Sequence, residues 1–122
     1  MGYSVETDLS RRLLSVSYTR DVGPEEARSC FEKVKTLLPA MQSGFRLLTD
    51  FSRLESMDSS CSPYMEQIMD FCGEKGVAMV VRVVPDPHKD IGYNIMSLFH
   101  YTRDVIIVTC SNLDEAASAL AD

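Results

Sequence analysis

The sequence lacks any concentration of positive charge. Its 122 residues contain 12 Lys and Arg against 18 Asp and Glu, a formal net charge of −6, and the basic pair Arg11-Arg12 is too short to form a stripe. Surfaces that bind nucleic acid or anionic membranes need such a stripe to neutralise phosphates. No apolar run approaches the roughly 18 residues that a membrane-spanning helix requires. We therefore expect no nucleic-acid partner and no membrane insertion.

Motifs for metal binding and catalysis are also missing. No Gly-rich phosphate loop, no Ser-His-Asp order and no pair of catalytic carboxylates is present. The cysteines form no Cys-x-x-Cys pair and have no zinc-ligand spacing with the histidines. These residues are Cys30, Cys61, Cys72, Cys110, His88 and His100. The chain begins without the charged and apolar regions of a signal peptide, so we expect free thiols, a cytoplasmic protein and no cofactor.

The apolar pattern predicts one α/β domain over residues 1–122, since a chain of this length buries about two-thirds of its unfolded surface. Residues 3–7, 12–18, 45–51, 77–84 and 105–109 have the composition of strands, and helices are expected to begin near residues 24, 62, 91 and 111. The order is β-β-α-β-α-β-α-β-α. It predicts a mostly parallel sheet of four to five strands with an antiparallel edge strand and about four helices.

Function in open α/β sheets gathers beyond the carboxyl ends of the parallel strands. We therefore expect three loops, residues 51–62, 85–90 and 109–112, to share one edge of the sheet. In the first, an apolar strand ends on Asp50, and a polar stretch with several hydroxyls precedes a helix. Unpaired N–H groups at a helix start favour negative charge, so this stretch suits a phosphate or a hydrogen-bonded partner.

Three short segments resemble the STAS family, the anti-sigma-factor antagonist fold. Residues 47–52 resemble the strand end of that family, Met57-Asp58-Ser59-Ser60 its phosphorylation segment, and residues 112–116 its closing acidic helix. Element order extends the resemblance over nearly the whole chain, although its specific part is about a dozen residues. Where the family has a glycine directly after the acceptor serine, this sequence has Cys61.

This resemblance implies a non-enzymatic regulatory module that binds a protein partner, either an anti-sigma kinase or a larger signalling assembly. Ser60 would be the phosphate acceptor, and Asp58 would orient its hydroxyl. The implied binding surface comprises Asp50, Ser52, Asp58, Ser59 and Cys61. An added Ser62-Pro63 offers Ser62 as the helix cap, which would leave Ser60 one turn outside the helix.

Other interpretations remain open. Ser59 and Ser60 could serve only as helix caps, and Ser62 could be the relevant hydroxyl. A relative that is not phosphorylated could form a homodimer or bind a small ligand, which should show as an apolar, methionine-lined pocket between the sheet and a helix. A third alternative is a thiol enzyme, in which a helix N-terminus lowers the pKa of Cys61 and His88 acts as its base.

Overall fold

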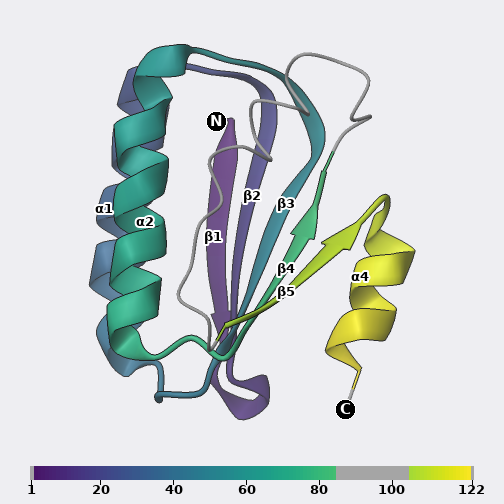
Figure 1. Ribbon diagram of the computed structural model, residues 1–122. Helices are drawn as coiled ribbons and strands as arrows, with labels where there is room; N and C mark the ends of the chain where they lie inside the picture. The colour runs from purple at the N-terminus through teal and green to yellow at the C-terminus, as the bar shows by residue number, and fades with distance from the viewer. Residues whose placement is uncertain (1, 85–104, 122) are drawn as a thin grey trace.

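The computed structural model describes residues 2–84 and 105–121, and its five strands form one sheet in the order β1-β2-β3-β4-β5 (Figure 1). Strand β1 (Tyr3–Asp8) pairs antiparallel with β2 (Leu13–Val22). Strands β3 (Arg46–Met57), β4 (Met79–Val83) and β5 (Ile106–Cys110) extend the sheet in parallel. The predicted α/β class, the mostly parallel sheet and the antiparallel edge strand are confirmed.

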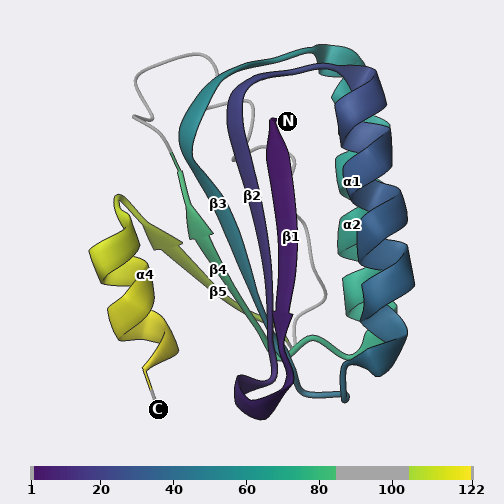
Figure 2. The same ribbon diagram turned by 180° about the vertical axis from the view of Figure 1, so that it is seen from behind.

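The helices lie on both faces of the sheet. Helices α1 (Pro24–Leu37) and α2 (Ser62–Lys75) run side by side on one face, and α4 (Leu113–Leu120) lies on the other (Figures 1 and 2). Right-handed crossovers that step in one direction across a sheet place their helices on the same face, which explains the pairing of α1 with α2. The helix predicted to begin near residue 91 and the loop 85–90 lie outside the described residues.

Apolar side chains fill both sides of the sheet. Successive residues of a strand point to opposite faces, so Val80 joins the core beneath α1 and α2, whereas Val81 joins the core beneath α4. The larger core includes Val16, Leu47, Phe51, Ala27, Cys30, Val34, Met65, Ile68 and Cys72. This two-sided burial explains why β4 is almost continuously apolar.

The ends of α4 and α2 follow local capping rules. Asn112 caps α4 by accepting from the Glu115 N–H at 2.9 Å, and the Glu115 carboxylate accepts from the Ser111 N–H at 2.9 Å. The cap lies one residue beyond residue 111, where the sequence predicts the helix to begin, because Asn112 and Glu115 form the capping pair. Helix α2 ends at Gly76, whose φ of 97° favours glycine.

Candidate functional site

Strand β3 is much longer than predicted. It continues to Met57, so the loop expected after Asp50 is strand for most of its length. Strand β4 stops at Val83, the pairing partner of Asp50. Strand β5 stops at the same level, at Cys110, which pairs with Val83. Strands β2 and β3 continue well beyond that level, as a two-stranded ribbon that curves over towards the starts of α1 and α2 (Figure 1).

Two irregularities bend this ribbon. Ser17 pairs with Asp50 but Thr19 pairs with Arg53, so β3 has an extra residue there, and a second register shift follows Arg20. Arg20 itself has a φ of 60°, in the left-handed region that a non-glycine residue seldom adopts. Bulges of this kind increase twist and turn a strand away from its sheet. They carry the ribbon to the helix layer.

The ribbon divides the predicted binding surface into two parts. Asp50 lies where β4 and β5 end, and its carboxylate accepts a hydrogen bond from the Ser52 N–H at 2.8 Å. Asp58 follows eight residues later, which in bulged strand corresponds to roughly 20 to 25 Å. The expectation that residues 51–62 and 109–112 share one edge was therefore wrong. Asp50 and Ser52 do not lie beside the predicted phosphate acceptor.

Residues 58–61, which we call the Ser60 turn, form the far end of the ribbon. Ser59–Cys61 is a single turn of 3-10 helix, capped by Asp58. The Asp58 carboxylate accepts from the Ser60 N–H at 2.9 Å and from the Ser60 hydroxyl at 2.6 Å. These hydrogen bonds, the hydroxyl first and the N–H second, lower the pKa of Asp58 below its ordinary value. Ser59 and Ser60 are both exposed at this end of the molecule.

The start of α2 places Ser60 just outside the helix. Cys61 is the cap residue, Ser62 is the first helical residue and Pro63 lies in the first turn. Ser62 is therefore not the cap, although the expectation that Ser60 precedes the helix is confirmed. Asp58 donates its N–H to the Val22 carbonyl at 3.2 Å, which ties the turn to the end of β2 beside the start of α1.

Cys61 has the opposite environment to its neighbour. Its side chain is 0% exposed, and its thiol donates to the Val22 carbonyl at 3.5 Å. Burial, and then the negative charge of Asp58, raise the pKa of this thiol. A thiol enzyme needs the reverse shift, so the expected low pKa was wrong, and its predicted base, His88, lies outside the described residues. The Cys61 side chain faces the core rather than the surface on which a partner would dock.

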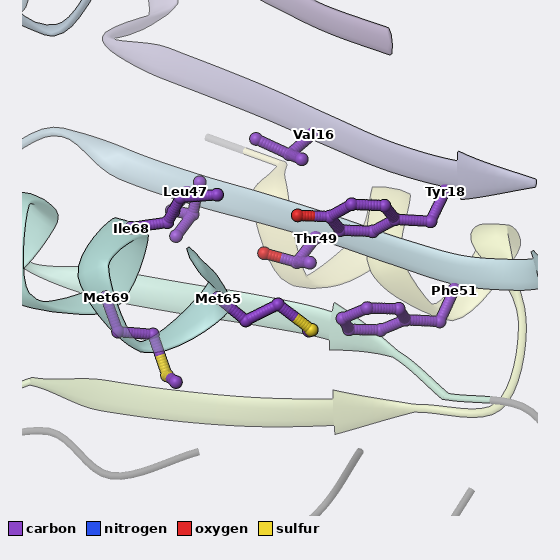
Figure 3. A pocket seen from close by; sticks show the side chains of 8 residues that line it. All are labelled: Val16, Tyr18, Leu47, Thr49, Phe51, Met65, Ile68 and Met69. Carbon is purple, nitrogen blue, oxygen red and sulfur yellow. The ribbon is translucent and has the colours of Figure 1, made fainter. Parts of the chain in front are cut away.

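A small cavity lies between the sheet and α2 (Figure 3). Tyr18 and Phe51 stack at one end of it, with ring centroids 5.4 Å apart and planes at 6°. Its other lining residues are Val16, Leu47, Thr49, Met65, Ile68 and Met69. Its volume of about 20 Å³ admits a single water molecule, whereas small-molecule pockets measure roughly 300 to 1,000 Å³. In the part of the chain that the structure describes, the methionine-lined space between the sheet and α2 is therefore too small for a ligand larger than one water.

All four cysteines are free and buried. Within residues 2–84 and 105–121, no three His, Cys, Asp or Glu side chains gather closely enough to hold a metal ion. In the same ranges no helix is long and apolar enough to cross a membrane.

The fold and the Ser60 turn together define a STAS-like α/β domain, and solved structures share that fold. An uncharacterized protein of the DUF3478 family from Shewanella loihica PV-4, described as having a SpoIIAA-like fold, matches with a TM-score of 0.70 and 11% identity, over 98% of this chain and 94% of that one. The Bacillus cell fate determinant SpoIIAA in its phosphorylated form matches with a TM-score of 0.64 and 14% identity, over 98% and 99% of the two chains. No family model and no curated protein sequence matches this chain.

A third similar structure is a complex. SiaC from Pseudomonas aeruginosa, bound to the diguanylate cyclase SiaD that it activates, matches with a TM-score of 0.57 and 17% identity, over 88% of this chain and 91% of that one. At identities this low the structural similarity shows the fold alone. The resemblance to the STAS family that the sequence predicted is confirmed at the level of the fold.

Proposed function

We propose that this protein is a non-enzymatic regulatory module that binds a protein partner through the Ser60 turn, and that phosphorylation of Ser60 weakens this binding. The observation that carries the proposal is an exposed hydroxyl, held by Asp58, directly before a helix on a STAS-like fold. SpoIIAA, which shares the fold, is an anti-sigma-factor antagonist with phosphorylated and unphosphorylated forms. The partner we propose is a serine kinase of the anti-sigma type or a signalling assembly that contains one.

Asp58 gives the turn a chemical role in the switch. The Ser60 hydroxyl donates its proton to the Asp58 carboxylate at 2.6 Å, which fixes the hydroxyl oxygen for attack on a phosphoryl donor. A phosphate would remove that donor and add a charge of about −1.5 to −2 beside the carboxylate. The start of α2 would offset part of the repulsion. We therefore expect the fold to persist while the surface of the turn becomes strongly negative.

Phosphoryl transfer gives the direct test. The protein is incubated with ATP, Mg²⁺ and a serine kinase of the anti-sigma type from the same genome, and the modified site is mapped by mass spectrometry. We expect one phosphoryl group on Ser60, no transfer to Ser60→Ala, and normal transfer to the matched variant Ser59→Ala. Transfer to Ser59 or Ser62 in the wild-type protein, or equal transfer to Ser60→Ala, would contradict the assignment.

The thiols support a cytoplasmic location. Four free, buried cysteines without a disulfide are typical of a reducing compartment. We accordingly propose that the partner is encountered there. Fractionation of the producing cells, with detection of the native protein, would show it in the cytoplasmic fraction if this is right.

A further inference from the structure

A surface groove of about 400 Å³ lies between α1 and α2, which run side by side (Figures 1 and 2). Phe31 of α1 forms one wall, and the other lining residues, Gln67, Asp70, Phe71 and Glu74, belong to α2. The ring of Phe31 contacts that of Phe71, with centroids 5.5 Å apart and planes at 31°. Both rings are half-buried, so part of each remains accessible from the groove.

Negative charge borders this aromatic groove. Asp70 and Glu74 are exposed and four residues apart, so they lie one above the other on α2. Glu66 extends the same row by another turn. Like charges at this spacing destabilise a helix by a few tenths of a kcal/mol per pair. Within residues 2–84 and 105–121 neither groove carboxylate has an ion pair, and Lys35, one turn beyond Phe31 on α1, does not supply one.

Aromatic faces beside unpaired carboxylates are the complement of a cation. A guanidinium group stacks on an aromatic ring and pairs with a carboxylate through a planar fork of donors, so Arg suits such a groove better than Lys. The groove volume also falls within the range of roughly 300 to 1,000 Å³ that binding sites occupy. Its size, its rings and its charge all favour the same kind of ligand.

We infer that this groove receives a basic side chain, preferably Arg, from the protein partner. The inference rests on the proposed function and extends it, because it specifies the chemistry of the partner's surface. Tyr64, in the first turn of α2, contacts Phe31 with centroids 6.5 Å apart. The aromatic row therefore begins beside the Ser60 turn and leads into the groove. A partner segment that covers the turn would continue along α2, with its basic residue between Phe31 and Glu74.

A peptide titration followed by NMR tests the groove without the natural partner. The probe is a short peptide with two Arg among neutral residues, and the same peptide with Lys or with Gln is the comparison. We expect saturable shifts of the Phe31 and Phe71 ring signals with the Arg peptide, weaker shifts with Lys and none with Gln. Shifts spread evenly over the protein, or equal shifts with Arg and Gln, would overturn the inference.

Two charge-matched double variants separate the groove from general electrostatics. Asp70→Asn with Glu74→Gln should weaken binding of the Arg peptide by about tenfold, since each exposed ion pair contributes up to about 1 kcal/mol. Glu6→Gln with Asp114→Asn removes the same charge elsewhere and should leave binding nearly unchanged. An equal loss in both double variants would contradict a specific groove.

A final variant distinguishes failure of the groove from failure of the switch. Ser60→Asp should bind the Arg peptide like the wild type, because the groove lining does not include Ser60. If the peptide binds and the kinase does not phosphorylate Ser60, the proposed switch is wrong and the inference about the groove is retained. If Ser60 is phosphorylated and no peptide binds, the inference about the groove is wrong and the switch stands.

Discussion

Ser60 and Cys61 are neighbours in the chain with opposite environments. Ser60 is exposed and its hydroxyl donates to the exposed Asp58, whereas Cys61 is 0% exposed and donates to the Val22 carbonyl. The pKa values differ in the same way. The pKa of Asp58, which accepts the Ser60 hydrogen bonds, is lowered, whereas the pKa of the buried Cys61 thiol is raised. The proposed interaction surface thus lies directly on the packed core, because the residue that follows the exposed Ser60 is already buried. Such a surface can change its charge without unfolding the domain.

The largest effect should come from placing a charge on the buried side of this pair. Cys61→Asp puts an unpaired carboxylate in the core and should cost more than about 4 kcal/mol, close to the whole stability of many domains. Ser60→Asp places the same group one residue away on the surface, where the cost should be within about 0.5 kcal/mol. Urea unfolding measures both variants. Similar losses in the two would remove the distinction between them.

The core beneath the turn should be almost as sensitive. Phe51 is fully buried and stacks on Tyr18, so Phe51→Ala should lower the free energy of unfolding by about 3 to 5 kcal/mol. Ser52→Ala, at the exposed next position of β3, is the matched control and should change it by less than about 0.5 kcal/mol. Thermal or urea unfolding of the two variants gives the comparison. A loss below about 1 kcal/mol for Phe51→Ala would mean that this core is poorly packed.

Thiol chemistry compares the two positions without measuring stability. Cys61 should react with iodoacetamide more slowly than a model thiol near neutral pH, because it is buried and its pKa is raised. The variant Ser60→Cys adds an exposed thiol one residue away, and this thiol should be alkylated first. Peptide mapping by mass spectrometry identifies the labelled site. Rapid labelling of Cys61 in the native protein would revive the thiol-enzyme interpretation.

The smallest predicted effect is in the titration of Asp58. Hydrogen bonds from Ser60 favour its ionised form, so its pKa in the folded protein lies below the ordinary value of 3.8. The stabilisation it supplies is therefore present above the unfolded pKa and is lost as pH falls through the folded one. Ser60→Ala removes the hydroxyl donor and should raise the Asp58 pKa, measured by carbon-detected NMR. An unchanged midpoint would show that the hydroxyl does not interact with Asp58 in solution.

The sequence predicted the elements whose signal is apolar. The run in β4 is buried in the core and the helical stripe of α1 faces the sheet, so the spacing of apolar residues was enough to infer their type and order. The run in β5 also predicted a strand, although Ile106 and Ile107 are exposed and Cys110 is its buried residue. The second half of β3 could not be inferred in this way. Beyond Phe51 it forms a ribbon in which Leu54 is the one buried residue before Cys61. The polar residues of this ribbon have the composition of a loop.

The candidate site was predictable in part for a related reason. Asp58 two residues before Ser60 is a local capping pattern, and the structure forms it. The separation of Asp50 from Asp58 depends on where neighbouring strands stop and where bulges fall, which single-sequence patterns do not encode. Phe71 was missed because it lies off the main apolar stripe of α2, although its spacing from Gln67 and Glu74 marks a second helix face.

The most direct test of the central claim is a binding titration with the proposed kinase partner. Protein phosphorylated at Ser60 and unphosphorylated protein are compared by calorimetry, after urea unfolding has shown that both are equally folded. The account predicts that the unphosphorylated form binds and that the phosphorylated form, like Ser60→Asp, binds at least about tenfold more weakly, a loss of about 1.4 kcal/mol or more. Equal affinity of the two folded forms would contradict the claim that Ser60 controls this surface.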